Sequence, residues 1–305
     1  MAFTYDLAKF IPFRDRQVCE RVRRIPKSEI AKHASPEFKI RVIEDPAAFY
    51  FEFALDIVTR IKTALEEGNK FVAILPVGPV PQFELAVRMI NELGISCRHV
   101  HTFNMDEYAD QDGNTAPTSW AGSFQQAMFD NFFNKIDPKL RVPESQIHFP
   151  TKQVIRSYSK MIEDMGGADV CYGGIGWCGH IAFWEAHLCE EFGDDLVAYK
   201  AAGARLVELH PMTIMQNALH SFSSDWSWVP PKANTIGPRD ILGAKYRSFW
   251  LDGHLGGGVT WQQFIARLVA HGPVNTAVPG SILQEVPTTY TIMGPVAADV
   301  KIQMA

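Results

Sequence analysis

The stretch that most constrains the fold lies at residues 169–186 and reads D-V-C-Y-G-G-I-G-W-C-G-H-I-A-F-W-E-A. It begins as a short apolar run and then passes through a turn that contains Gly173, Gly174, Gly176 and Gly179. A strand that ends in such a turn can bring backbone N–H groups close to a ligand, because glycine has no Cβ to block the approach or forbid positive φ. The stretch therefore predicts a ligand site at the carboxyl end of a strand.

Segments with strand and helix character alternate along the chain. The run F-V-A-I-L at residues 71–75 is typical of a strand buried on both faces of a parallel sheet. Further strands are predicted at residues 97–103, 206–209, 235–236, 246–251 and 290–293, and helices at residues 46–68, 82–93, 120–133, 154–165 and 260–271. This alternation predicts an α/β fold in which helices sandwich a mostly parallel sheet, a Rossmann-like three-layer architecture.

The chain divides into two regions by composition. Residues 1–45 carry scattered charge and the prolines Pro12, Pro26 and Pro36, and we interpret them as an N-terminal extension packed on the main body. Residues 46–305 then form a single α/β domain, with no internal repeat and no low-complexity linker.

Composition excludes several classes of partner. The 305 residues are 47% apolar and 21% charged, and the net charge is −5. The small basic cluster Arg21, Arg23, Arg24 and Lys27 is too short for a phosphate backbone, so we expect no nucleic-acid partner. No apolar run reaches the roughly 18 residues of a membrane span, and a signal-peptide pattern is missing at the start, so we expect a cytoplasmic protein without membrane contact. Five cysteines without CxxC spacing indicate neither a disulfide framework nor a zinc knuckle.

Two sites in the sequence could carry acid–base chemistry. Asp106 follows a predicted strand in T-F-N-M-D-E-Y, where burial and the neighbouring Glu107 would favour a general base, although a helix or turn cap is the alternative. His180 and Glu185 follow the glycine turn, and a carboxylate there could orient the imidazole for proton transfer, although a lone histidine is more often structural. Cys178 is a nucleophile only if a nearby base lowers its pKa.

Other patterns support weaker hypotheses. Residues 174–179 fit G-x-G-x-x-G, but Trp177 would crowd a pyrophosphate and no acidic residue ends a following strand at the expected distance, so no cofactor is predicted. His99 and His101 share a strand face without a third ligand, so no metal is predicted either. The segment 226–228, W-S-W, is a packed loop or a carbohydrate platform.

These motifs resemble those of the glucosamine-6-phosphate deaminase/isomerase family, which is related to 6-phosphogluconolactonases. T-F-N-M-D-E-Y at residues 102–108 matches the family motif throughout, and G-G-I-G-W-C-G-H-I-A-F-W-E at residues 173–185 matches G-G-x-G-x-D-G-H-I-A-F-N-E except at Cys178 and Trp184. The resemblance covers about residues 45–300 and implies a cofactor-free reaction on an amino-sugar phosphate. It implies that His180, oriented by Glu185, assists ring opening and that Asp106 moves a proton between C2 and C1.

The chain also departs from the family pattern. Cys178 stands where the family has aspartate, and Trp177 and Trp184 stand where it has asparagine. The family's phosphate loop L-P-T-G-G-T-P reads L-P-V-G-P-V-P at residues 75–81, and the family's lysine has no counterpart in D-G-H-L-G-G-G-V at residues 252–259. By this comparison most of the 6-phosphate site is missing. The residues expected to bind substrate are Gly78, Glu107, Gly174, Gly176, Trp177, Trp184 and Gly257.

Two interpretations stay open. The chain is an isomerase or deaminase whose sugar lacks the phosphate or presents another group, for example to the backbone of residues 256–258; or it is a sugar-binding or regulatory protein with weakened catalysis. A lactonase fits less well, because that branch continues D-G-H-T-A-S where this chain has C-G-H-I-A-F at residues 178–183. The resemblance also implies a homo-oligomer, with residues 1–45 available for an interface.

Overall fold

A seven-stranded parallel sheet forms the centre of the fold, which is described here from a computed structural model covering residues 5–255 and 260–302. Its strands run in the order β1-β10-β9-β6-β2-β3-β5, and every neighbouring pair is parallel. The strands are β1 (Phe38–Ile43), β2 (Phe71–Leu75), β3 (Val100–Asn104), β5 (Ile147–His148), β6 (Val170–Gly173), β9 (Tyr246–Leu251) and β10 (Thr288–Met293). The mostly parallel α/β prediction is confirmed.

A smaller antiparallel sheet lies beside the main one, and the sequence did not predict it. It consists of β4 (Asp106–Ala109), β8 (Lys232–Thr235) and β7 (Arg205–Glu208), in that order. The segments expected at residues 206–209 and 235–236 are strands, but they belong to this sheet rather than to the parallel one. Only Met105 separates β3 from β4, so the chain passes directly from the large sheet into the small one.

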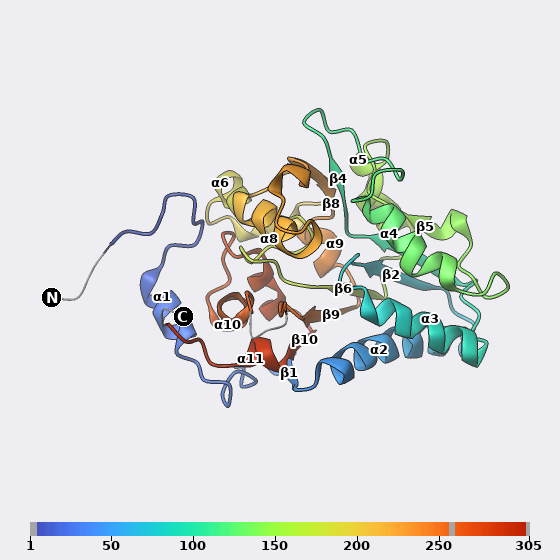
Figure 1. The fold of residues 1–305 in the computed structure, drawn as a ribbon, viewed down its shortest axis with the longest axis horizontal. Coiled ribbons are helices and arrows are strands. Elements are labelled where there is room, and N and C mark those ends of the chain that lie inside the picture. Colours follow the sequence, from blue (N-terminus) through green and yellow to red (C-terminus); the bar gives the residue numbers. More distant parts are fainter. Residues whose placement is uncertain (1–4, 256–259, 303–305) are drawn as a thin grey trace.

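Helices flank the large sheet. Figure 1 shows α2 and α3 side by side along one face of the sheet, with α5 and α9 on the opposite side. The helices are α1 (Arg16–Arg23), α2 (Pro46–Glu66), α3 (Pro81–Leu93), α4 (Phe124–Asn131), α5 (Ile155–Asp164), α6 (Cys189–Phe192), α7 (Leu196–Ala201), α8 (Pro211–Ser221), α9 (Pro238–Leu242), α10 (Gln263–His271) and α11 (Gly294–Ala297). Within residues 5–255 and 260–302, none of these helices has the length and apolar character needed to cross a membrane.

The N-terminal region is part of this architecture rather than an addition to it. Strand β1 pairs along its whole length with β10, so residues 38–43 form an edge of the main sheet and the boundary placed at residue 46 does not match the fold. Helix α1 packs on α10, and the buried Arg267 of α10 donates to the carbonyl of Ile25. The sequence of β1 alternates apolar and charged residues, as half-buried edge strands do.

We predict that Phe38→Ala destabilises the whole domain. Phe38 is only 2% exposed and packs against the ring of Tyr290, so its truncation should lower the free energy of unfolding by about 3–5 kcal/mol. Phe10→Ala is the matched control, because this phenylalanine is 58% exposed and should change stability by no more than about 0.5 kcal/mol. Urea unfolding measures both; equal, small effects would show that β1 is not part of the folded core.

Candidate active site

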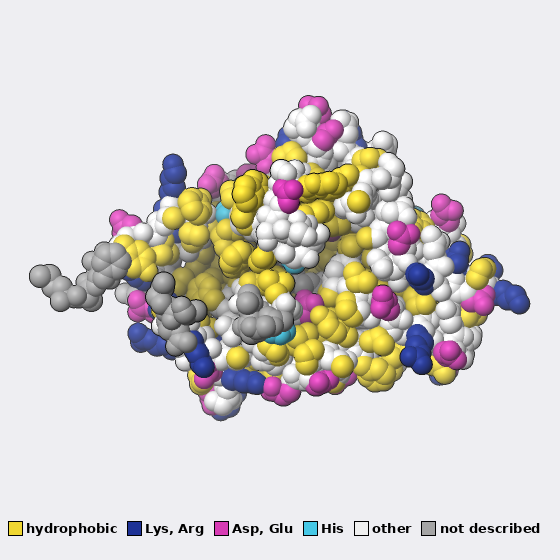
Figure 2. Space-filling model, in the orientation of Figure 1, with side chains coloured by type: hydrophobic (Ala, Val, Ile, Leu, Met, Phe, Trp, Pro, Cys, Tyr) yellow, Lys and Arg dark blue, Asp and Glu magenta, His cyan; other side chains and the backbone are white. Residues whose placement is uncertain are grey.

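A cavity of about 500 Å³ opens at the carboxyl edge of the large sheet. Its walls come from the loops that follow β2, β3, β6 and β9, together with residues 121–124, one side of α8 and Trp261. Ligands of open α/β sheets bind at this edge, so the strand order alone explains why distant segments meet here. On the face drawn in Figure 2, apolar side chains gather over the centre and most Lys and Arg residues lie toward the edges.

Asp106 faces this cavity from the first position of β4. Its side chain is 8% exposed, and burial, followed by the charge of neighbouring Glu107, raises its pKa to about 8. A carboxyl group with a pKa near neutrality can both accept and return a proton, which suits a general base.

His180 lines the same cavity, and the hydroxyl group of Thr213 contacts its imidazole. Thr213 Oγ1 lies 2.9 Å from His180 Nδ1, and the same hydroxyl donates to Glu185 Oε2 at 2.9 Å. The single hydrogen of Thr213 is then used, so its oxygen accepts from Nδ1–H and leaves His180 Nε2 without a hydrogen. Gly176 packs against this ring: a Cβ there would lie 2.0 Å from Nε2, so no other residue fits.

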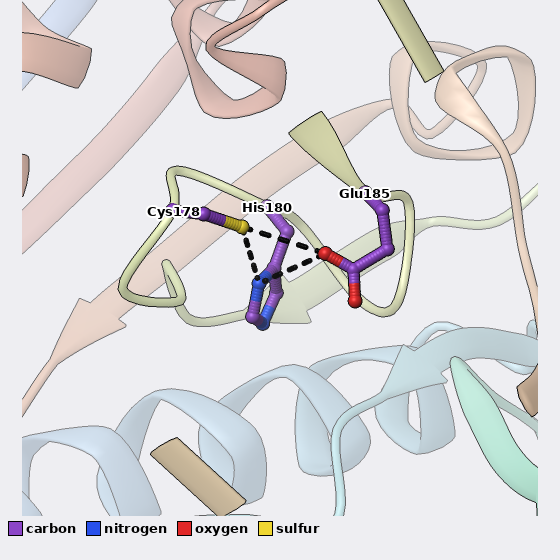
Figure 3. Close-up of side chains that lie close together, drawn as sticks. All are labelled: Cys178, His180 and Glu185. Carbon is purple, nitrogen blue, oxygen red and sulfur yellow. Dashed lines mark hydrogen bonds and ion pairs between the residues drawn. The ribbon is translucent and has the colours of Figure 1, made fainter. Parts of the chain in front are cut away.

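Glu185 anchors the arrangement from a fully buried position. Its carboxylate accepts from Thr213, from the Cys178 thiol at 3.4 Å and from the backbone N–H of His210 at 3.2 Å. Burial raises its pKa to about 8 and lowers that of His180 to about 3, with the charges of His210 and His220 adding to the second shift. Figure 3 shows the three sequence-predicted residues Cys178, His180 and Glu185 converging.

Cys178 lies behind the imidazole and does not line the cavity. Its Sγ is 3.2 Å from His180 Nδ1, and burial raises the pKa of the thiol well above its ordinary value. A neutral thiol with no access to the cavity cannot attack a substrate, so a nucleophilic role for Cys178 is not supported.

Glu107 has a different role from the one predicted, because it points away from the cavity. Its carboxylate accepts from the backbone N–H groups of Tyr108, Phe124 and Gln125 and from the hydroxyl of Ser123. The last three donors form the N-terminus of α4, where a negative charge is favourable. Successive residues of a strand face opposite sides of the sheet, so Asp106 and Glu107 cannot both face the cavity.

Of the other residues predicted to bind substrate, some line the cavity and others do not. Gly78, Gly174 and Gly176 line the cavity. Trp184 does not: it is 1% exposed and packs against Phe192 and Tyr199 in the core.

Trp177 is not among the lining residues; it is 37% exposed, and its backbone N–H donates to the side-chain oxygen of Gln216. Gly257, with the triglycine backbone at residues 256–258, lies outside the described residues.

The sequence interpretation missed Thr213 and Asp252. Thr213 lies in the first turn of α8, which follows β7, and it bridges His180 to Glu185. Asp252 directly follows β9, lines the cavity and accepts from the hydroxyl of Tyr50 at 2.9 Å. The carboxyl-edge rule pointed to the position of Asp252 but not to that of Thr213, which follows a strand of the antiparallel sheet, and no local pattern marked either residue as functional.

The electrostatics of the cavity are unlike those of a phosphate site. Its described lining includes the carboxylates of Asp106 and Asp252 and three histidines, but no Lys or Arg. The undescribed stretches 1–4, 256–259 and 303–305 contain neither Lys nor Arg in their sequence. The loop that follows β2 contributes Val77 and Val80, which carry no hydroxyl group.

Comparisons with known proteins identify relatives of this chain. No model of a known protein family matches the chain. The glucosamine-6-phosphate deaminase of Caenorhabditis elegans is 34% identical over 213 residues, covering 67% of this chain and 72% of that protein. Glucosamine-6-phosphate deaminase 2 of Giardia intestinalis is 31% identical over 242 residues, covering 77% of this chain and 82% of that protein.

Solved structures show the same fold. A monomeric glucosamine-6-phosphate deaminase superposes with a TM-score of 0.71 at 23% identity, over 85% of this chain and 99% of that one. The 6-phosphogluconolactonase of Thermotoga maritima superposes with a TM-score of 0.58 at 16% identity, over 83% of this chain and 98% of that one. The fold is thus the α/β class shared by sugar-phosphate deaminases and lactonases. Within that class, the chain belongs to the glucosamine-6-phosphate deaminase family.

We predict that Asp106→Asn stabilises the protein, increasingly so as pH rises. The folded carboxyl keeps its proton up to about pH 8, whereas the unfolded chain loses it near an ordinary pKa of about 3.9. The contribution of this carboxyl group to the free energy of unfolding is therefore fully present below about pH 4. It is lost as the pH rises toward 8, by at most about 1.4 kcal/mol per pH unit.

Urea unfolding of wild type and Asp106→Asn between about pH 5 and pH 8 measures this advantage. The exposed Asp112→Asn variant is the control and should follow wild type. A constant difference across this range would contradict the raised pKa of Asp106.

Proposed function

We propose that this protein is a cofactor-independent amino-sugar isomerase and deaminase whose substrate carries no phosphate at the position where its relatives bind one. One observation carries the proposal. Asp106 and His180, whose Nε2 carries no hydrogen, line the same cavity, and the described lining offers no Lys or Arg. The membership of the chain in the glucosamine-6-phosphate deaminase family supports the reaction type.

His180 acts first in the proposed reaction. Its free Nε2 accepts the proton of the anomeric hydroxyl and returns a proton to the ring oxygen, so the sugar opens to the aldehyde. Thr213 and Glu185 keep the Nδ1 hydrogen in place, which leaves Nε2 as the working atom throughout.

Asp106 acts on the open chain. Its carboxylate removes the proton from C2, the carbonyl oxygen takes up a proton from water, and the resulting enolamine receives the carried proton at C1. The product is a C2 iminium ion, which water hydrolyses to a ketose with release of ammonium. Because the same group moves the proton off C2 and onto C1, a pKa close to neutrality favours both halves of the transfer.

The far end of the cavity supports a neutral substrate. The residue that follows β9 is Asp252 and not a positively charged residue. Its carboxyl group accepts a hydrogen bond from Tyr50 and can accept another from a sugar hydroxyl. A phosphate dianion would meet no compensating cation among the described lining residues.

We predict that the purified protein exchanges hydrogen at C2 of an unphosphorylated amino sugar in deuterated water. Glucosamine, glucosamine 6-phosphate, glucose and glucose 6-phosphate are incubated separately, and NMR follows deuterium at C2 and C1 and the release of ammonia. Asp106→Asn should abolish exchange, whereas Asp112→Asn should retain it. Binding of a sugar without exchange in wild type would favour the alternative of a sugar-binding protein.

We predict that Leu255→Lys improves the binding of glucosamine 6-phosphate relative to glucosamine. Leu255 lines the cavity and is partly exposed, so a lysine there would add the cation that the described lining lacks. An exposed ion pair contributes up to about 1 kcal/mol, or about fivefold in affinity. Calorimetry measures both sugars, with Leu255→Met as the uncharged control. Tight, phosphate-dependent binding to wild type would overturn the assignment of a neutral substrate.

A further inference from the structure

Four side-chain atoms behind the cavity form a closed cluster. They are Cys178 Sγ, His180 Nδ1, Glu185 Oε2 and Thr213 Oγ1. Their six mutual distances are 3.2, 3.4, 3.6, 2.9, 2.9 and 3.7 Å. Figure 3 shows the first three residues converging on one point from the glycine turn and from the segment that follows it. All four residues are buried.

The cluster contains fewer hydrogens than pairs of neighbouring polar atoms. The thiol, the hydroxyl and Nδ1 supply one hydrogen each, and a protonated Glu185 would supply a fourth. The six pairs share at most these four hydrogens, so at least two pairs have no hydrogen between them. The two most widely spaced pairs, at 3.6 Å and 3.7 Å, are ordinary contacts without one.

The same spacing matches tetrahedral metal coordination. The six edges are similar in length, and the centre of a regular tetrahedron of this size lies about 2.0 Å from each corner, close to Zn–N and Zn–O bond lengths of about 2.0–2.2 Å. Zn–S bonds are slightly longer, about 2.3 Å, and the sulfur indeed makes three of the longer edges. Thiolate, imidazole and carboxylate are also the three ligand types that zinc uses in proteins.

We propose that Cys178, His180 and Glu185 bind a zinc ion, with the Thr213 hydroxyl or a water molecule as the fourth ligand. A thiolate and a carboxylate together cancel the charge of a divalent cation, so the ion can occupy a buried site without net charge. Binding releases the thiol proton and requires His180 to carry its hydrogen on Nε2 instead of Nδ1. The backbone N–H of His210 already orients the outer oxygen of Glu185 at 3.2 Å, as a supporting contact does for metal ligands.

Zinc binding would change what His180 offers to the cavity. With the metal on Nδ1, the cavity-facing Nε2 carries the hydrogen and can no longer accept a proton. This consequence rests on the proposed function, in which Nε2 must accept the anomeric proton. Zinc-loaded protein should therefore lose sugar turnover and recover it when a chelator removes the ion.

The binding itself is tested without substrate. Full-length protein freed of metal by a chelator is titrated with Zn²⁺ by calorimetry and with Co²⁺ by absorbance. We expect one equivalent of Zn²⁺ with a dissociation constant below about 1 μM, and a near-ultraviolet thiolate band with Co²⁺. Cys178→Ser should abolish the band and weaken Zn²⁺ binding by at least about 100-fold, because even loss of a supporting contact costs up to that much.

Two controls make the outcome decisive. Cys189→Ser removes a half-buried cysteine outside the cluster and should bind both metals as wild type does. Cys178→Asp keeps an anionic ligand and should bind Co²⁺ without the thiolate band. Thermal unfolding of each variant without metal confirms folding. Weaker or non-stoichiometric Zn²⁺ binding in wild type, or a Co²⁺ band that persists in folded Cys178→Ser, would overturn the zinc site while leaving the sugar reaction untouched.

Discussion

The buried carboxylate of Glu185 is the interaction on which the site depends. It accepts hydrogen bonds from Thr213, Cys178 and the backbone of His210, and so joins the glycine turn after β6 to the first turn of α8. Burying a carboxylate is costly, and the three donors offset only part of that cost, because the pKa of Glu185 is still raised to about 8. The position of His180, and with it the direction of Nε2, follows from this contact.

A second constraint separates two adjacent carboxylates. Asp106 and Glu107 begin the short strand β4, whose pairing with β8 fixes the alternation of side chains. One carboxylate faces the cavity, and the other accepts the free N–H groups at the start of α4. The same dipeptide therefore provides a carboxyl group in the cavity and a structural cap, and the cap contacts Ser123 and Phe124, which line the cavity.

The departures from the family motifs concern the lining of the cavity and the residues that contact His180 outside it. Val77, Val80, Leu255 and Asp252 line the cavity, and none of them offers a cation or a hydroxyl group. Cys178 changes the environment of His180 without entering the cavity. Asp106 and His180 keep the identities that the family motifs have, so the changes lie in other residues of the cavity lining and in the residues that contact the imidazole.

The sequence by itself determined the α/β class and the positions of most strands of the large sheet, and it named Asp106, His180 and Glu185 as candidates, because apolar runs, glycine turns and motifs are local patterns. Only the tertiary structure decided that residues 38–43 complete the sheet, that Glu107 and Trp184 point away from the cavity, and that Thr213 links His180 to Glu185. Strand register, side-chain direction and contacts between residues 28 or 33 positions apart depend on packing that no local pattern encodes.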